Sequence, residues 1–178
     1  MDYKIQELEK EKWQGYEIMF CDYADNVYNM EVKCEDNGFS VAIEKKPLEQ
    51  RKEIKYPNKL FEPWLTNVKA WGVIENEQLI AVIETSVGND NRLYVSELWV
   101  DEKYRRRGIA TALMNAAKTR AVEEKCRAVF LETRSCNEHA IDFYISQGFT
   151  LIGFDTCAFS NEDINRNNVP LKLGYFPQ

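Results

Sequence analysis

The sequence predicts a mixed, mostly antiparallel β-sheet with helices on its faces, in the α+β or α/β class. The first observation is three apolar runs rich in β-forming residues, at 69–75, 78–86 and 93–100, separated only by short turns. The second is an amphipathic helical stripe at 108–125, and the third is a buried-type strand at 128–133. A strand, helix, strand order predicts one parallel pair with a right-handed crossover.

Short turns connect the three runs into antiparallel strands. Asn76 and Glu77 separate the first two runs, which indicates a hairpin. The segment 88–91, Gly-Asn-Asp-Asn, is a second turn. We therefore expect three antiparallel strands in succession before the helix.

After the parallel pair, the sequence predicts a second helix and two late strands. Asn137 is placed to cap a helix that runs to about Gln147, and Gly148 suits the position just after its end. The late strands are 149–154 and 169–175, paired antiparallel across an intervening loop.

The N-terminal third is read from weaker patterns. Residues 22–28 are predicted to be a short helix or turn. Residues 39–44 alternate as a strand does, ending before Pro47. Residues 45–59 are polar and strongly charged, which indicates an exposed loop or short helix.

Composition limits the class of protein and its partners. With 178 residues, 44% of them hydrophobic and 29% charged, the chain is predicted to be one globular domain, 1–178. It contains no apolar run of the roughly 18 residues that a membrane helix needs, and no apolar signal region near residue 1, so we expect a cytoplasmic protein without membrane contact. A net charge of −6 disfavours nucleic acid and favours a cationic small molecule.

The cysteines and the one histidine point away from metal sites and disulfides. The five cysteines are odd in number and widely spaced, with no Cys-x-x-Cys, and His139 stands alone, so no metal site is predicted. Cys136 and His139 are three residues apart, which leaves a covalent acyl-cysteine scheme as an alternative without an evident orienting acid.

A basic turn between the strand at 93–100 and the following helix has the composition of an anion site. Unpaired N–H groups in the first turn of a helix point outward at the positive end of its dipole. Gly108 permits close approach of a phosphate, and Arg105, Arg106 and Arg107 add charge. The dinucleotide fingerprint and the nucleotide P-loop are both absent, and the pattern is Arg-x-x-Gly-x-Ala. The turn predicts a phosphorylated cofactor.

This pattern resembles the Gln/Arg-x-x-Gly-x-Gly/Ala signature of the GNAT superfamily of N-acetyltransferases, which use acetyl-coenzyme A (acetyl-CoA). A second block of that family is matched by Asn137, Ala140, 143–144 and 148–149. The resemblance covers about 67–155, and leaves 1–65 as elements on the acceptor side. It implies a GNAT-like fold whose sheet splays open at the parallel pair.

The resemblance also implies the cofactor contacts. The pyrophosphate of acetyl-CoA would lie on the turn and first helical residues, and the pantetheine arm would pair like an extra strand with the preceding strand. Asn137 would hold the arm from the other side. The cofactor-binding residues are thus expected to be Leu98, Trp99, Val100, Arg105, Arg106, Arg107, Gly108, Ile109, Ala110, Thr111 and Asn137. A solvated charge run and a simple helix cap are the structural alternatives.

Catalysis by direct attack in a ternary complex needs a neutral amine and a proton for the departing thiolate. By resemblance, Tyr144 is the expected general acid, and Glu97 the base or the ammonium anchor, with Glu84 as a second candidate. Carboxylates within apolar strands are uncommon, which makes both informative. The alternatives are that Tyr144 is a half-buried helix aromatic and that the carboxylates face solvent.

A closer resemblance is to the streptothricin acetyltransferases, on 131–133 with Asn137, then 153–155 and 159–161. It implies transfer to an amine of the β-lysine moiety of that antibiotic, hence antibiotic resistance. Two other classes stay open: acetylation of a protein N-terminus, a lysine or a polyamine, and a non-catalytic domain that binds acetyl-CoA. A homodimer is possible, since dimers are frequent in the superfamily.

Overall fold

The computed structural model describes residues 3–177, which fall into two compact units. The first contains the described residues up to Cys21, Lys55–Leu131 and the residues from Gly174 on, and the second contains Asp22–Ile54 and Glu132–Leu173. One sheet has the strand order β1 (Ile5–Glu7), β4 (Val68–Glu75), β5 (Gln78–Val87), β6 (Arg92–Val100), β7 (Ala128–Arg134), β9 (Pro170–Tyr175) and β8 (Thr150–Phe154). A two-stranded sheet joins β2 (Glu17–Glu35) to β3 (Gly38–Lys59).

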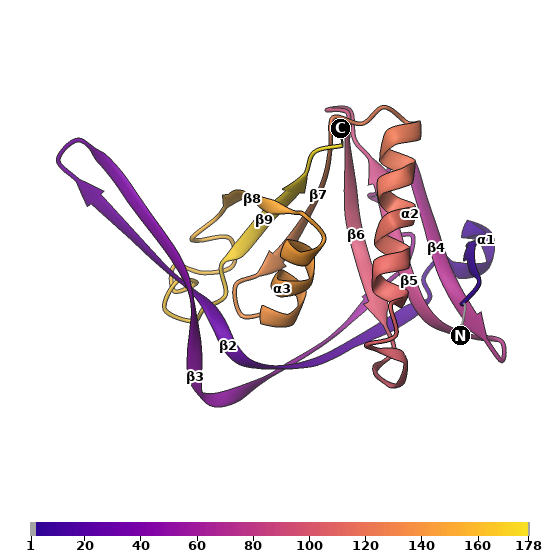
Figure 1. Ribbon diagram of the computed structural model, residues 1–178, viewed down its shortest axis with the longest axis horizontal. Helices are drawn as coiled ribbons and strands as arrows, with labels where there is room; N and C mark the ends of the chain where they lie inside the picture. Colours follow the sequence, from indigo (N-terminus) through magenta and orange to yellow (C-terminus); the bar gives the residue numbers. More distant parts are fainter. Residues whose placement is uncertain (1–2, 178) are drawn as a thin grey trace. The chain divides into compact units, whose positions relative to one another are not determined.

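The three predicted antiparallel strands of the first unit are confirmed as β4, β5 and β6 (Figure 1). Asn76 and Glu77 link β4 to β5 with φ angles of 48° and 65°. Two positive φ angles are typical of the type I′ hairpin turn, whose twist matches that of the strands. A bulge interrupts the β5–β6 register after Glu84, where Ser96 is the extra residue on β6.

β6 and β7 form the predicted parallel pair, so the mixed-sheet fold class is confirmed. Their register pairs run from Arg92 and Ala128 to Tyr94 and Phe130. Within the described residues, β6 continues from Val95 to Val100 beyond the last of these pairs.

Helices cover both faces of the first unit's strands. α2 (Ile109–Glu123) runs alongside β5 and β6 (Figure 1), and its buried residues include Leu113 and Ala117. The guanidinium of Arg120 on α2 donates to Oγ1 of Thr85 at 2.7 Å. Because side chains alternate along a strand, Val82 and Glu84 face the opposite way. There they meet a second core cluster that includes Trp13 of α1 (Lys10–Trp13) with Leu8, Ile18, Leu60, Phe61, Ala70 and Leu79.

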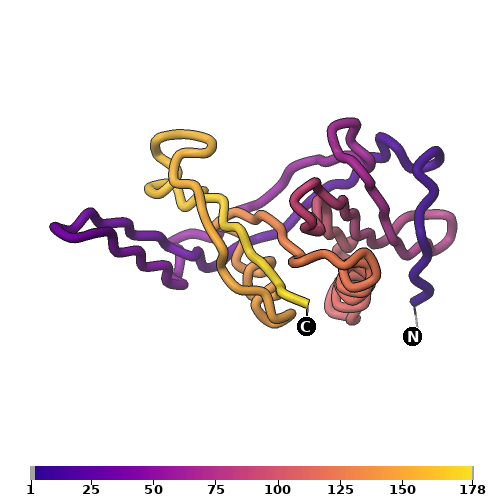
Figure 2. The backbone as a smooth tube through the Cα atoms, turned by 90° about the horizontal axis from the view of Figure 1, so that it is seen from above, coloured from indigo at the N-terminus to yellow at the C-terminus, as the bar shows by residue number. Residues whose placement is uncertain are grey.

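Of the three predictions for the N-terminal third, the strand at 39–44 is confirmed as part of β3, and the other two are wrong. Residues 22–28 are strand rather than helix or turn, and residues 45–59 are strand rather than loop. The two strands continue to a turn at residues 36–37, as the paired traces in Figure 2 show.

Two physical features obscured these strands in the sequence. The buried residues Ala24, Val27 and Met30 recur at every third position, a spacing closer to that of a helix than of a strand. Pro47 falls inside β3 because a ribbon of only two strands leaves an outward backbone edge, where proline's missing N–H has no consequence.

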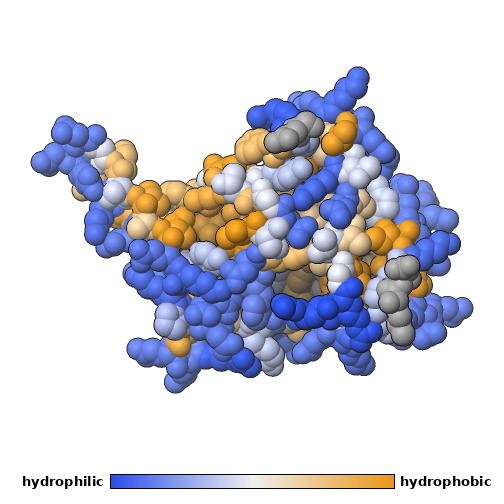
Figure 3. All heavy atoms as spheres, viewed as in Figure 1, coloured by the Kyte–Doolittle hydropathy of each residue, from blue (hydrophilic) through white to orange (hydrophobic). Residues whose placement is uncertain are grey.

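The remaining predicted elements of the second unit are confirmed. α3 (Glu138–Ser146) follows Asn137, and Gly148 ends it with a φ of +83°. β8 and β9 are the two late strands, and they are neighbours in the sheet. The space-filling view shows a patch of apolar side chains on one face of the molecule (Figure 3). On β8, the apolar residues Leu151 and Ile152 are exposed. No helix in the described part of the chain has the length and apolarity to cross a membrane.

Candidate active site

The backbone of the turn before α2 has a conformation that suits an anion. Gly108, at the N-cap position, has a φ of +80°, and Arg106 has a φ of +61°. The N–H of Ala112 makes the first intrahelical bond, to the Gly108 carbonyl at 3.0 Å. The amides of 109–111 precede that bond and are therefore the outward donors of the helix end. Consecutive amides turned by left-handed residues form the concave arrangement that holds phosphates.

The three arginines of this turn have different tasks. Arg105 donates to the carbonyls of Val100 at 3.2 Å and Cys21 at 2.6 Å. Arg107 donates to the hydroxyl of Tyr3 at 3.0 Å. Among the described residues, none pairs with the exposed guanidinium of Arg106. Arg105 thus fixes the turn to the end of β6, while Arg106 supplies charge.

The turn fits a pyrophosphate by its own composition. The first turn of α2 contains no acidic residue, so nothing there repels an anion. Asp101, which precedes the turn, accepts the N–H of Lys103 at 3.0 Å and starts the short helix η1 (Glu102–Tyr104) instead. Outward amides, a cationic side chain and the absence of a carboxylate form a coherent phosphate site.

Directly before this turn, the end of β6 has no register partner on β7 among the described residues, and its Val100 carbonyl accepts from Arg105. Leu98, Trp99 and Val100 pair on one side with β5 and lie beyond the last register pair with β7. The indole N–H of Trp99 donates to the Met19 carbonyl at 2.8 Å, which fixes its ring. An extended ligand arm can pair with this edge as an added strand does.

Two carboxyl groups lie side by side on β5 and β6, on the face away from α2. Glu84 and Glu97 are register partners, and directly opposed residues of an antiparallel pair project to the same face. Glu84 is fully buried and accepts from the hydroxyl of the bulged Ser96 at 2.8 Å and from the N–H of Phe61 at 2.5 Å. The side-chain amide of Asn58 donates to Glu97. Glu84 is thus held inside the first unit, and Glu97 is partly buried and hydrogen-bonded rather than fully turned to solvent.

Burial raises the pKa of both carboxyl groups, and the charge of Glu84 adds to the effect at Glu97. Burial, followed by the charge of Glu84, raises the pKa of Glu97 to about 8, against the hydrogen bond from Asn58. Burial likewise raises the pKa of Glu84, opposed by its hydrogen bonds from Phe61 and Ser96. A carboxyl group that titrates near neutral pH has the ionisation expected of a general base.

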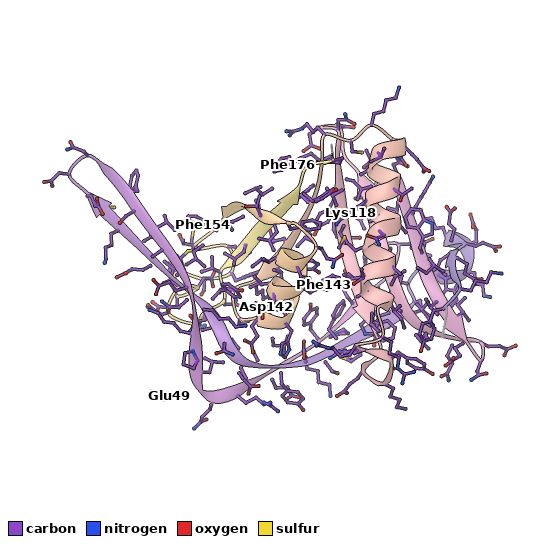
Figure 4. All side chains as sticks on the ribbon, in the orientation of Figure 1. Glu49, Lys118, Asp142, Phe143, Phe154 and Phe176 are labelled. Carbon is purple, nitrogen blue, oxygen red and sulfur yellow. The ribbon has the colours of Figure 1, made fainter. Side chains whose placement is uncertain are left out.

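The other two candidate residues, Asn137 and Tyr144, lie in the second unit. Asn137 occupies the N-cap position of α3, but its side chain makes no capping hydrogen bond. Tyr144 is 9% exposed and packs between Phe143 and Phe149, with ring centroids at 5.5 and 5.9 Å. Figure 4 labels Phe143 on α3. Tyr144 is therefore held by aromatic packing, a condition for a fixed hydroxyl group.

Comparison with known proteins decides the family. The model of the acetyltransferase (GNAT) family matches residues 24–149, more than half of the chain. The chain belongs to the GNAT family of acetyltransferases. Acetyl-CoA is the cosubstrate of this family, so the predicted resemblance and cofactor are confirmed.

Curated relatives of this GNAT protein include two kinds of acetyltransferase. A streptothricin acetyltransferase of Escherichia coli is 28% identical over 106 residues, which is 60% of this chain and 61% of that protein. N-alpha-acetyltransferase 30 of Xenopus laevis is 45% identical over 58 residues, which is 33% of this chain and 21% of that protein. The chain therefore spans about a fifth of the second relative and three fifths of the first.

Solved structures share the fold over the whole chain. A nourseothricin acetyltransferase superposes with a TM-score of 0.72 at 21% identity, covering 99% of both chains. A Bacillus anthracis protein described as a streptothricin acetyltransferase, crystallised with acetyl coenzyme A, has a TM-score of 0.68 at 20% identity and covers 98% and 99%. These similarities confirm the fold of this GNAT protein.

The alternative covalent scheme finds no geometric support in this GNAT protein. The thiol of Cys136 is buried, whereas the ring of His139 is exposed and lies 3.3 Å from Asp22. Within the described residues, no contact joins the thiol to the imidazole. The pair therefore lacks the arrangement that activates a cysteine nucleophile.

Sequence reasoning missed the residues that hold the two carboxylates. Asn58 and the Phe61 amide come from the end of β3 and the segment after it, which the sequence presents as a charged loop. Ser96 is visible in the sequence only as one residue of a strand, and its hydrogen bond depends on the bulge. No local signal marks any of the three, because each acts across the sheet.

Proposed function

We propose that this GNAT protein transfers an acetyl group from acetyl-CoA to a primary amine of a small cationic acceptor, with the β-lysine moiety of streptothricin as the substrate. The reaction proceeds by direct attack in a ternary complex. Bound acetyl-CoA supplies an activated thioester. The residues of this chain bind it, position the amine and move the protons.

The turn and the β6 edge are the proposed binding elements. The amides of Arg106 to Thr111 hold the pyrophosphate, with Arg106 adding charge and Arg105 keeping the turn in place. The backbone of Leu98 to Val100 pairs with the pantetheine arm. Asn137, whose side chain is not used as a cap, is the proposed further partner of the arm.

The observation that carries the proposal is Glu97. Glu97 directly precedes Leu98 to Val100 on β6, and its carboxyl group has a pKa of about 8. An ammonium group that approaches the Glu84–Glu97 pair is attracted to it, and favours the ionised form of Glu97. Ionised Glu97 then takes the proton that the acceptor must lose to become nucleophilic. Glu84, which is fully buried, maintains the field at Glu97.

Tyr144 is the proposed general acid. A phenol has an ordinary pKa near 10 and a thiol near 8.5, so proton transfer to the thiolate depends on a fixed position of the phenol. The aromatic packing of Tyr144 against Phe143 and Phe149 supports such a position.

Two observations support a polycationic acceptor. The net charge of −6 attracts cations, and the relatives with broad coverage are streptothricin or nourseothricin acetyltransferases. A second candidate, acetylation of a protein N-terminus, is favoured by the 45% identity to N-alpha-acetyltransferase 30 over 58 residues.

An acceptor comparison tests the proposal. Purified protein and acetyl-CoA are combined with streptothricin, spermidine or peptides with free N-termini, and release of free coenzyme A thiol is followed. We expect the highest kcat/KM with streptothricin. A preference for peptides would establish the second candidate instead. Binding of acetyl-CoA by calorimetry without acetylation of any amine would contradict an enzymatic role.

A further inference from the structure

The second unit contains a group of side chains that encloses a primary ammonium group. The Nζ atom of Lys45 lies 2.5 Å from Oδ2 of Asp142 and 3.2 Å from Oε2 of Glu138. The hydroxyl of Tyr28 donates to Oδ1 of Asp142 at 2.6 Å. Glu138 and Asp142 are four residues apart on α3 and therefore share one face of the helix. We call Glu138, Asp142 and the Tyr28 hydroxyl the ammonium cradle; Figure 4 labels Asp142.

The surroundings of Glu138 are those of a carboxylate paired with a cation. Its side chain is only 3% exposed, and its Oε1 accepts the backbone N–H groups of Asp25 at 2.8 Å and Asn26 at 3.0 Å. Its Oε2 accepts no hydrogen bond from the residues that the structure describes, and it is directed at the Lys45 ammonium. Burial opposes ionisation, but the hydrogen bonds from Asp25 and Asn26 and the neighbouring Lys45 ammonium lower the pKa of Glu138. A buried carboxylate with a free oxygen requires a cation nearby.

The surroundings of the cradle retain an excess of negative charge. Asp22 faces the His139 ring, and Asp25 is occupied by a two-pronged pair with Arg51 at 2.8 Å. Lys45 is therefore the cation that balances the two cradle carboxylates. Its side chain is 38% exposed, so the position of its ammonium group can be reached from solvent. An ammonium group in place of that of Lys45 would meet the same two carboxylates, which hydrogen bonds from Tyr28, Asp25 and Asn26 hold in position.

We propose that the ammonium cradle is a binding site for a primary ammonium group of the acceptor, which takes the place of the Lys45 ammonium. The assignment to the acceptor rests on the proposed function, because a polycation such as streptothricin carries ammonium groups besides the one acetylated. The cradle recognises charge and shape: a primary ammonium has three N–H donors, which suit the oxygens presented here. Its occupant is held for recognition and does not react there.

Chemical rescue tests the ammonium site without any turnover. Lys45→Ala removes the resident ammonium and its stem, and ethylammonium chloride is then added to the purified full-length variant. We expect ethylammonium to raise the melting temperature of Lys45→Ala by about 3 °C more than equal sodium chloride does. Wild type and the double variant Lys45→Ala with Asp142→Asn should show no such difference. An equal response in all three proteins overturns the site; Lys45→Met serves if Lys45→Ala fails to fold.

Steady-state kinetics test the assignment to the acceptor. Asp142→Asn keeps the shape and removes one charge, so we expect KM for streptothricin to rise roughly tenfold, with KM for acetyl-CoA unchanged. Lys45→Met should lower KM for streptothricin, because it removes the competing ammonium. Glu31→Gln, which breaks the exposed pair with Lys33 in the same unit, is the matched control and should change neither constant.

The two experiments distinguish failure of the ammonium site from failure of the proposed function. If Lys45→Ala is rescued but wild type acetylates no cationic acceptor, the ammonium site stands and the proposed function is wrong. If streptothricin is acetylated but KM is the same in Asp142→Asn, the assignment of the cradle to the acceptor is overturned.

Discussion

The turn before α2 and the carboxyl pair on β5 and β6 lie in the same unit but are made in opposite ways. The turn is exposed and continuous in sequence, and the groups proposed to bind phosphate are backbone amides oriented by Gly108 and Arg106. The carboxyl pair is discontinuous, with Glu84 buried and Glu97 partly buried, and its properties come from side chains on neighbouring strands. A backbone site depends on conformation at one or two positions, whereas a side-chain site depends on everything packed around it.

This contrast predicts the largest effect at Gly108. Gly108→Asp puts a side chain on a residue with φ of +80° and adds a negative charge beside the phosphate donors, so we expect the Kd for acetyl-CoA to rise at least 100-fold, which is about 3 kcal/mol. Isothermal titration calorimetry measures it. Gly15→Asp is the matched control, since Gly15 has a φ of +77° in the same unit and also has open space around its Cβ position. Unchanged affinity in Gly108→Asp would remove the phosphate assignment.

Tyr144→Phe should affect chemistry rather than cofactor binding. Loss of one proton-transfer group typically lowers kcat by about 10²-fold, and we expect that loss with the affinity for acetyl-CoA preserved. Tyr16→Phe, at a tyrosine that is 40% exposed, controls for the loss of a hydroxyl. A pH–rate profile identical to that of wild type in Tyr144→Phe would refute the acid role.

Glu97→Gln should remove a specific pH dependence. The base must be ionised, so the wild-type rate rises with pH through the Glu97 pKa of about 8. The variant should be slower by up to about 10²-fold and lack that rise, as kcat/KM measured from pH 6 to 9.5 would show. A retained inflection near pH 8 would assign it to another group.

The raised pKa of Glu97 also predicts that stability falls as pH rises, whereas the reaction rate rises. Because the pKa of Glu97 is raised on folding, the folded state holds the proton more tightly than the unfolded state. Its contribution to stability is complete below the ordinary glutamate pKa near 4.3 and is lost as pH rises to about 8. The melting temperature of Glu97→Gln relative to wild type should therefore be higher at pH 8.5 than at pH 5.

The contrast also explains what the sequence could predict. The turn, α2 and the hairpin of β4 and β5 follow from local signals, namely Gly108, a helical stripe and the Asn76–Glu77 pair, and all three were predicted correctly. Glu97 was predicted from the family resemblance with Glu84 as a second candidate, and the rarity of charge inside apolar strands supported both. Their partners Asn58 and Phe61 were not predicted, since their positions depend on how distant segments pack.

The ribbon of β2 and β3 marks where local patterns mislead. Its stability comes from backbone pairing between strands whose side chains are mostly polar and exposed, so neither a hydrophobic stripe nor strict alternation reveals it. Lys45 lies in that misread stretch. Its contact with Asp142 joins residues 97 positions apart and was therefore beyond any local signal.

The smallest expected effect concerns how strongly the charge of Glu84 raises the pKa of Glu97. Glu84→Gln keeps an acceptor for Ser96 and Phe61 but removes the second largest cause of the raised Glu97 pKa. The inflection of the pH–rate profile should move below 8 and stay above the ordinary glutamate value, because burial of Glu97 is unchanged. Glu62→Gln removes a more weakly acting charge, so its shift should have the same direction and be smaller. Equal profiles in wild type and Glu84→Gln would mean that Glu97 owes its ionisation to burial alone.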